Sequence, residues 1–265
     1  MGKNYTYKPG DPFPYQYKYE HMAVTTDCVI FTYEDWQLKV LLVRRGGEPY
    51  KGEWAFPGGF LRMNETAEQG ALRELQEETA LVPTSLGQLG VFSDVDRDPR
   101  ERVITIAWYA LVKPYEVIGG DDADEAAWFP VDDLPPLAFD HHKIFEAAME
   151  RLRRDIHFQP VGFDLLDEEF TIPDLQRLYE AILGVKFDRR NFQRKILASG
   201  ILESVGKEGA NDDYLCCSEE SLAFVQPDGA LPAPKKSRQG RRGILFRLNK
   251  KKYEELKEDG LKQEF

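Results

Sequence analysis

Cysteine, long apolar runs and internal repeats are all scarce or missing in this 265-residue sequence. Its three cysteines, Cys28, Cys216 and Cys217, fit neither a disulfide framework nor the spacing of zinc ligands, so we expect reduced thiols. No stretch approaches the ~18 consecutive apolar residues of a membrane helix, and residues 1–10 contain no apolar secretory segment. We therefore expect a cytoplasmic protein with no membrane partner.

Composition and length indicate a folded chain of two domains. Hydrophobic residues make up 42% and charged residues 31%, which excludes wholesale disorder. At about 100–200 residues per domain, two domains are favoured over one large α/β domain. We place an aromatic N-terminal arm at 1–22, a first domain at 23–155 and a second domain at 160–265.

The net charge of −11 argues at first against nucleic acid, but the charge is unevenly distributed. The first 160 residues contain 17 Lys or Arg against 27 Asp or Glu, whereas the remaining residues contain 18 against 19. Lys186 to Lys195 holds five basic residues and one acid, and Lys235 to Lys252 holds nine basic residues and no acid. A basic surface on an acidic protein is therefore expected in the second domain.

The first domain shows strands interrupted by two helices. Strand patterns cover Val24–Tyr33, Leu38–Val43, Gly90–Val95, Val103–Val112 and Ala127–Val131, and helical patterns cover Thr66–Thr79 and His142–Arg154. Helices inserted among mixed strands predict an α/β sandwich rather than a regular βαβ repeat.

The second domain has the element order of a winged helix. Thr171 is placed to cap a helix at Ile172–Leu183, with Gly184 after its end, and Asp188 is placed to cap a second helix reaching Ser199. Strand patterns follow at Ile201–Val205 and Ile244–Leu248. The stretch between them, 209–243, is polar and long for a simple wing.

Clustered carboxylates mark the helix at Thr66–Thr79. Glu74, Glu77 and Glu78 fall on one arc of this helix, beside its apolar face. Carboxylates so close together repel one another and lose hydration, so a cation must compensate them. Mg²⁺ or Mn²⁺ suits such oxygen ligands and also binds diphosphate oxygens. The alternative is a solvated acidic helix face with intrahelical ion pairs.

Residues 59–81 resemble the Nudix box, Gly-x5-Glu-x7-Arg-Glu-aliphatic-x-Glu-Glu-x-Gly-aliphatic. The similarity extends upstream through Gly52-Glu53-Trp54-Ala55-Phe56-Pro57-Gly58-Gly59 and covers about residues 23–155. One position departs, because Ala80 stands where the family has glycine. A positive φ is often needed after such a helix, so we expect Ala80 to cost roughly 1 kcal/mol or to shift the loop.

The resemblance implies a Nudix α/β/α sandwich with a mixed sheet and hydrolysis of a nucleoside diphosphate linked to another group. It implies catalytic roles for Glu65, Arg73, Glu74, Glu77 and Glu78, the last three as metal ligands. The bound metal would neutralise the diphosphate and activate a water molecule. The family's general base often lies outside the box, which leaves Asp122, Asp124 and Glu125 as candidates by position.

The loop Asp94-Val95-Asp96-Arg97-Asp98-Pro99-Arg100 resembles the corresponding loop of small bacterial ADP-ribose pyrophosphatases and of their regulator relatives. Arg97 and Arg100 are suited to phosphate or ribose oxygens, and Gly58 and Gly59 complete the expected substrate site. The alternative is a charge-rich hairpin turn. The expected ligand is ADP-ribose or a related nucleotide sugar.

The basic second domain resembles the winged helix of Nudix-related transcriptional regulators, in which ADP-ribose or a related metabolite displaces the protein from its operator. Some regulators of similar build sense a sugar instead. Expected contacts with double-stranded DNA come from the second helix and the wing, namely Arg189, Arg190, Gln193, Arg194, Lys195, Arg241 and Arg242. Lys250, Lys251 and Lys252 are expected to extend the wing. DNA reading of this kind usually needs a symmetric homodimer.

Three functions remain open at this point. The first is a DNA-binding regulator whose Nudix domain senses, and sometimes hydrolyses, its ligand. The second is a metal-dependent ADP-ribose pyrophosphatase whose second domain is structural. The third is a binding module without turnover. The complete set of box residues favours chemistry over the third, and the basic segments favour the first over the second.

Overall fold

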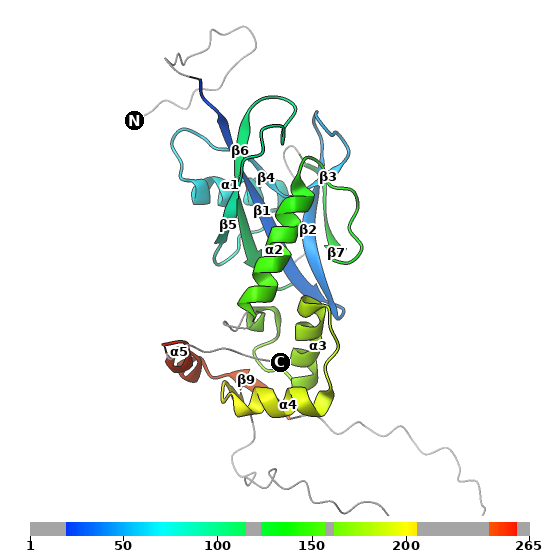
Figure 1. Ribbon diagram of the computed structural model, residues 1–265, viewed down its shortest axis with the longest axis vertical. Helices are drawn as coiled ribbons and strands as arrows, with labels where there is room; N and C mark the ends of the chain where they lie inside the picture. Colours follow the sequence, from blue (N-terminus) through cyan, green and yellow to red (C-terminus); the bar gives the residue numbers. More distant parts are fainter. Residues whose placement is uncertain (1–19, 115–122, 157–161, 206–243, 259–265) are drawn as a thin grey trace, which may run out of the picture.

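The computed structural model describes residues 20–114, 123–156, 162–205 and 244–258 (Figure 1). Within these ranges the chain forms a seven-stranded mixed sheet with helices, followed by a smaller helical unit with a two-stranded sheet. This confirms the expected α/β/α sandwich and C-terminal winged helix. None of the helices in these ranges is long and apolar enough to cross a membrane.

The large sheet is mixed, as the sequence predicts. Its strands are β1 (Ala23–Glu34), β2 (Gln37–Arg45), β3 (Trp54–Ala55), β4 (Gly58–Phe60), β5 (Gly87–Phe92), β6 (Val103–Leu111) and β7 (Ala123–Pro130). They follow the order β3-β2-β1-β6-β5, and β4 also pairs with β1 and β7 with β2. β1 and β6 run parallel, and the other pairs are antiparallel. β3 and β4 were not predicted, because two or three residues are too few to show a strand period.

Two helices cover opposite faces of this sheet. Alternate residues of a strand point to opposite faces, and those of β1 divide accordingly. Cys28 and Ile30 pack with α1 (Ala67–Thr79), whereas Val29 and Phe31 pack with α2 (His141–Asp155). Because both faces are covered, β1 is buried over most of its length, which explains the unbroken apolar run Cys28–Phe31 at its centre.

The winged helix forms from the capping signals that the sequence shows. α3 (Ile172–Leu183) begins with a capping box between Thr171 and Asp174 and ends at Gly184. α4 (Arg189–Ala198) begins at Asp188, whose side chain accepts from the backbone N–H of Asn191. The short 3-10 turn η1 (Phe163–Leu165) precedes α3, and β8 (Leu202–Ser204) pairs with β9 (Phe246–Leu248) after α4.

The structure corrects the expected end of the wing. Lys250, Lys251 and Lys252 do not extend it but form the first turn of a helix, α5 (Lys250–Glu258). The Asn249 side chain accepts from the backbone N–H of Lys252 at 2.9 Å, as a helix cap does. Tyr253 is buried and anchors the helix. The sequence analysis missed this helix because the run of lysines dominates the segment, although Asn249 caps the helix and Tyr253 anchors it.

One apolar core connects the two parts of the molecule. Phe31, Val40 and Leu42 of the sheet, Ile144, Ala148 and Leu152 of α2, and Leu175, Leu178 and Ile182 of α3 belong to the same buried cluster, which continues into α4 through Phe192 and Ile196. In Figure 1, α3 lies directly below the β1–β2 hairpin and the end of α2. The winged helix is therefore packed on the sandwich.

Helix α1 ends in the strained conformation that the sequence predicts. Ala80 adopts φ 59° and ψ 8°, and its N–H donates to the Gln76 carbonyl at 3.0 Å. This left-handed conformation suits glycine and disfavours a residue with a Cβ. Gly184 closes α3 in the same way, with φ 69° and a bond to the Glu180 carbonyl.

We expect Ala80→Gly to raise the free energy of unfolding by about 1 kcal/mol, because glycine removes the steric cost of this conformation. Urea denaturation followed by circular dichroism measures the change. The reciprocal control, Gly184→Ala, is expected to lower stability by a similar amount. An unchanged or less stable Ala80→Gly variant would contradict the interpretation.

Candidate functional site

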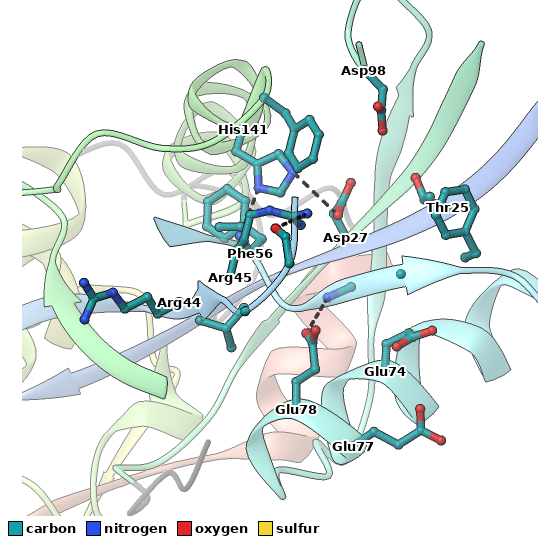
Figure 2. A pocket seen from close by; sticks show the side chains of 18 of the residues that line it. Thr25, Asp27, Arg44, Arg45, Phe56, Glu74, Glu77, Glu78, Asp98 and His141 are labelled. Carbon is teal, nitrogen blue, oxygen red and sulfur yellow. Dashed lines mark hydrogen bonds and ion pairs between the residues drawn. The ribbon is translucent and has the colours of Figure 1, made fainter. Parts of the chain in front are cut away.

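A pocket of about 690 Å³ opens where α1 and β4 face the end of β2 and the start of α2 (Figure 2). Its wall contains most of the residues that the sequence singled out, namely Gly58, Gly59, Arg73, Glu74, Glu77, Glu78, Arg97 and Arg100. Glu65 lies outside the wall but binds Arg73. The fold therefore brings the box and the Arg97–Arg100 loop to one cavity.

The three glutamates share one side of α1 because residues three and four apart in a helix are neighbours. Glu74 approaches the backbone of β4 closely. A Cβ at Gly59 would lie 2.7 Å from the carboxyl carbon of Glu74. A side chain at this position would therefore displace the Glu74 carboxylate.

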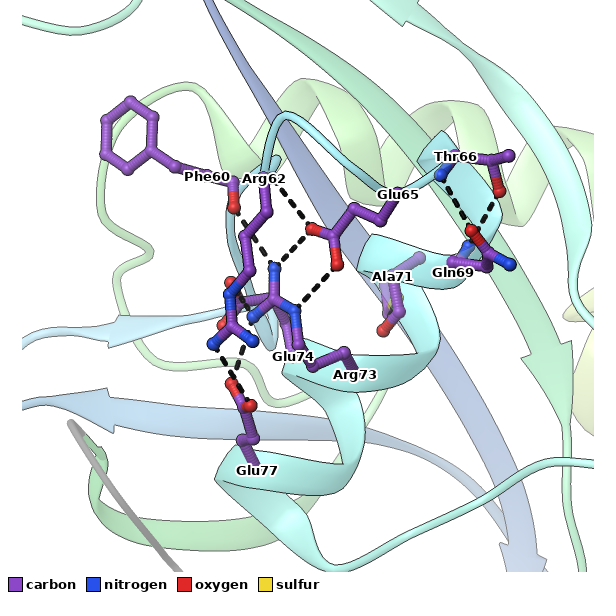
Figure 3. A network of polar contacts seen from close by, with 10 residues as sticks. Phe60, Arg62, Glu65, Thr66, Gln69, Ala71, Arg73, Glu74 and Glu77 are labelled. Carbon is purple, nitrogen blue, oxygen red and sulfur yellow. Dashed lines mark hydrogen bonds and ion pairs between the residues drawn. The ribbon is translucent and has the colours of Figure 1, made fainter. Parts of the chain in front are cut away.

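Arg73 holds three carboxylates in place (Figure 3). Its Nε and Nη2 donate to the two carboxylate oxygens of Glu65 at 2.9 and 2.6 Å. Its Nη1 donates to Glu74 at 2.6 Å and to Glu77 at 3.0 Å. The hydrogen bonds from Arg73 lower the pKa of Glu65 to about 2, and bonding to Glu65 in turn raises the pKa of Arg73. The paired geometry fixes both side chains.

Glu78 points into the interior of the pocket. Burial raises its pKa to about 8, and the charges of Glu74 and Asp27 act in the same direction. The backbone N–H of Gly58 donates to Glu78 Oε2 at 2.9 Å and opposes the shift. Burial also raises the pKa of Glu74. Glu78 is therefore mostly protonated at neutral pH when no cation is nearby.

The donor set suits a hard divalent cation that shares its ligands with a bound substrate. In the described ranges, no group of three or more His, Cys, Asp or Glu side chains is assembled to hold a metal alone. Mg²⁺ is usually held by one or two carboxylates together with substrate phosphates and water. Glu78, with its raised pKa, and Glu74 are carboxylates whose charge a cation would stabilise.

The opposite wall contains a buried set of charged groups. Arg97 Nε and Nη2 donate to the two oxygens of Asp140 at 3.2 and 2.7 Å. Arg97 Nη2 and His141 Nε2 each lie 3.7 Å from the carboxylate of Asp27. These four residues are buried, and Arg97, Asp27 and His141 line the pocket. Arg97 thus stands where the sequence predicts, held from behind by Asp140.

His141 is a neutral hydrogen-bonding group in this wall. Its Nδ1 accepts from the backbone N–H of Phe56 at 2.9 Å, and burial lowers its pKa. Since Nδ1 accepts, the single ring proton of the neutral form is on Nε2, which faces Asp27.

Arginines and aromatic rings form the outer part of the pocket. The guanidinium of Arg45 lies 4.7 Å from the centre of the Phe139 ring, and that of Arg100 lies 5.2 Å from the centre of the Phe60 ring. Asp98 accepts from Arg100 Nε and Nη2 at 3.0 and 2.7 Å. The pocket therefore combines an acidic wall on α1 with arginines and rings facing it. This combination suits an anionic ligand with a ring system and a bridging cation.

Sequence reasoning missed Asp27, His141, Arg45 and Phe139. Only Asp27 leaves a signal, as the one charged residue between Ala23 and Tyr33 of β1. Among the candidate general bases, Glu125 is exposed on β7 and lies 3.8 Å from Arg44, whereas Asp122 and the side chain of Asp124 lie outside the described residues. No general base is assigned by this geometry.

A second candidate surface is the outer face of α4. Its buried side is formed by Phe192 and Ile196. The predicted DNA-contacting residues of this helix are all exposed on the other side: Arg189, Arg190, Gln193, Arg194 and Lys195. Within the described ranges none of their charges is paired with an acid. Arg241 and Arg242 lie outside the described residues.

Comparisons with known proteins match both parts of the chain. The NUDIX domain model matches residues 22–148, and the NrtR DNA-binding winged helix domain model matches residues 162–213. An ADP-ribose pyrophosphatase of Methanocaldococcus jannaschii is 45% identical over 131 residues, 49% of this chain and 75% of that protein. The ADPR responsive transcriptional repressor NtrR of Acinetobacter baylyi is 31% identical over 191 residues, 70% of this chain and 76% of that protein.

Solved structures of NrtR from Shewanella oneidensis are similar as well. The structure complexed with a 27mer DNA has a TM-score of 0.64 and 32% identity, and the match covers 87% of this chain and 95% of that one. The Nudix domain of that protein complexed with ADP ribose has a TM-score of 0.50 and 40% identity, covering 52% of this chain and 94% of that one.

Glu78→Gln is expected to gain stability relative to the parent as the pH rises from about 5 to about 8, measured by urea denaturation with a chelator present. The native parent keeps a proton on Glu78 up to its pKa of about 8, whereas the unfolded chain releases it near 4.5. The free energy of unfolding of the parent therefore falls by on the order of 3 kcal/mol across this window, whereas that of the glutamine variant does not change through this group.

The matched control is Glu65→Gln. The pKa of Glu65 is lowered to about 2, so the stability from its pairing is fully present above about 4.5 and is lost only as the pH falls further. This variant is expected to be less stable than the parent by the same amount at pH ~5 and ~8. A flat difference between Glu78→Gln and the parent over this range would contradict the desolvation of Glu78.

Proposed function

Because this chain belongs to the NrtR family, which joins a Nudix domain to a winged-helix DNA-binding domain, we propose that it is an ADP-ribose-responsive transcriptional repressor. The observation that carries the proposal is the match to the DNA complex of NrtR over 87% of this chain. The same molecule holds a pocket suited to a nucleotide sugar and an exposed basic helix. A pyrophosphatase with a merely structural second domain does not account for that helix.

The ligand of the pocket is ADP-ribose, as in the Nudix domain of the Shewanella relative. Its pyrophosphate lies between α1 and the arginines of the opposite wall, near Gly58 and Gly59. Arg97 has Nη1 left for a phosphate or ribose oxygen, since Asp140 takes the other two donors. Arg100 offers its charge beside the Phe60 ring. These contacts are charge-assisted and therefore strong.

Glu74, Glu77 and Glu78 would hold Mg²⁺ or Mn²⁺ together with the phosphates of the ligand. When bound, the cation neutralises the diphosphate and lowers the pKa of a coordinated water. Glu78 has to release its proton before it can act as a ligand, so the affinity for metal rises with pH towards about 8. Arg73 and Glu65 orient Glu74 and Glu77 through the bonds described above.

DNA binds along the exposed face of α4. Arg189, Arg190 and Arg194 contact phosphates or base edges, because the start of a recognition helix meets the major groove. Gln193 and Lys195 extend the same face. A symmetric homodimer places two such helices on paired half-sites, which is the usual arrangement for helix-turn-helix readers. A repressor has to reach its operator DNA, so we place the protein in the cytoplasm.

Hydrolysis of ADP-ribose is a second activity that the pocket supports. The specific observation is the full set of box carboxylates with Arg73 in place, together with the similarity to the archaeal pyrophosphatase. Hydrolysis would remove the ADP-ribose that releases the repressor from DNA.

The proposed function is tested by DNA retardation with the region upstream of the protein's own operon, with and without ADP-ribose. We expect a specific complex that ADP-ribose dissociates, both with magnesium and with a chelator. Absence of specific DNA binding, or a complex that is indifferent to ADP-ribose, would refute the repressor.

Replacing Arg190 and Arg194 together by alanine is expected to weaken DNA binding at least about tenfold and to reduce its salt dependence. Binding and hydrolysis of ADP-ribose stay unchanged. The control, Lys51→Ala with Lys113→Ala, removes the same charge from exposed positions of the sandwich. If the α4 variant binds DNA like the parent, α4 is not the recognition helix.

Glu77→Gln is expected to reduce metal-dependent hydrolysis of ADP-ribose by more than about a hundredfold while DNA binding is retained. Product formation is followed by chromatography. Glu68→Gln, an exposed acid in the first turn of the same helix, is the matched control. Full turnover by the Glu77 variant would remove Glu77 from the metal ligands.

A further inference from the structure

Two elements of the sandwich have one end in the ADP-ribose pocket and the other end on the winged helix. β1 contributes Thr25 and Asp27 to the pocket and reaches the β1–β2 hairpin about 20 Å further along. α2 begins at the pocket with His141, and Arg153 lies about 18 Å further along, near the other end of the helix. Figure 1 shows both ends above α3.

The contacts at the far ends are specific. The Trp36 ring at the tip of the hairpin lies 4.1 Å from the guanidinium of Arg177 on α3. Arg153 Nε of α2 donates to the carbonyl of Ile182 on α3 at 3.2 Å. Tyr33, just before the hairpin, is buried in the shared core with α3. Among the described residues, a cation–π contact, a hydrogen bond and an apolar interface therefore hold the winged helix on the sandwich.

At the pocket, the ends of β1 and α2 lie beside charged groups that an anionic ligand would attract or repel. Arg97 is bound through two hydrogen bonds to Asp140, the residue that immediately precedes α2. A phosphate that draws Arg97 towards itself therefore pulls on the start of α2. The ligand also adds negative charge beside Asp27 in β1. Both elements are packed along their length, so a shift at one end is transmitted to the other rather than absorbed.

Space for α3 to move exists beside these contacts. A second cavity of about 670 Å³ lies between the hairpin, α2 and α3, and its wall includes Trp36, Met149, Arg153 and Ala181. A tilt of α3 towards the hairpin and α2 would be directed into this cavity. α4 would follow, because Phe192 of α4 is in ring contact with Tyr179 of α3.

We propose that Trp36 and Arg177, with Arg153, form the contact through which ligand in the Nudix pocket changes the position of the DNA-reading helix. These are positioning residues that touch neither ligand nor DNA. The inference rests on the proposed function, since it concerns how ADP-ribose acts on DNA binding. It adds the residues that link the two sites.

The test measures the coupling factor, the ratio of DNA dissociation constants with and without saturating ADP-ribose, by fluorescence anisotropy on the operator duplex. Trp36→Ala and, separately, Arg177→Ala are expected to reduce this factor at least about threefold. The affinity for DNA alone and for ADP-ribose alone should stay within about twofold, because neither ligand touches these residues. Trp36→Phe keeps a ring and restores the coupling.

A matched pair tests the α2 end. Arg153→Gln removes the bond to Ile182 and is expected to reduce the coupling. Arg154→Gln, at an exposed neighbour whose Nε lies 3.8 Å from Asp155 of its own helix, is expected to leave it unchanged. By reciprocity, DNA must change the ADP-ribose affinity of each variant by the same reduced factor.

The outcomes separate this inference from the proposed function. A parent protein that binds DNA without any response to ADP-ribose refutes the repressor and this inference with it. A responsive parent whose Trp36 and Arg177 variants keep full coupling refutes only the inference. Loss of DNA or ligand affinity with coupling unchanged would also refute it, since that is the mark of a purely structural contact.

Discussion

The candidate site depends on the compensation of partly buried carboxylates by guanidinium groups, above all that of Arg73. α1 places three glutamates at the edge of its buried face, and burial raises the pKa of two of them. Arg73 donates hydrogen bonds to Glu74 and Glu77 and also binds Glu65. A helix that held these acids without Arg73 would have unpaired charges away from water, which is among the costliest arrangements in a protein. The position of the pocket, the packing of Gly59 and the suitability for a cation all follow from this arrangement.

Much of the fold was predictable because its signals are local. The Thr171 cap, the end of α3 at Gly184 and the strained Ala80 each depend on residues within one or two helical turns. The Nudix box is local too, because α1 alone supplies its carboxylates. The expected mixed sheet and winged helix were confirmed for the same reason.

The other half of the pocket was not predictable, since its contacts join distant parts of the chain. Arg97 was expected to face a ligand, but its partner Asp140 lies 43 residues away and has no motif of its own. His141 meets the Phe56 backbone across 85 residues. α5 was missed because a run of lysines looks like a wing, while only Tyr253 anchors it. Such pairings require the tertiary structure.

The position of α4 gives the uneven charge distribution of the chain a physical consequence for its encounter with DNA. In Figure 1, α4 lies at the end of the molecule opposite the start of the strongly acidic sandwich. A DNA polyanion attracts one pole of such a particle and repels the other, so encounters are oriented before contact. Random genomic sequence, bound only by electrostatics, retains a protein of this kind weakly.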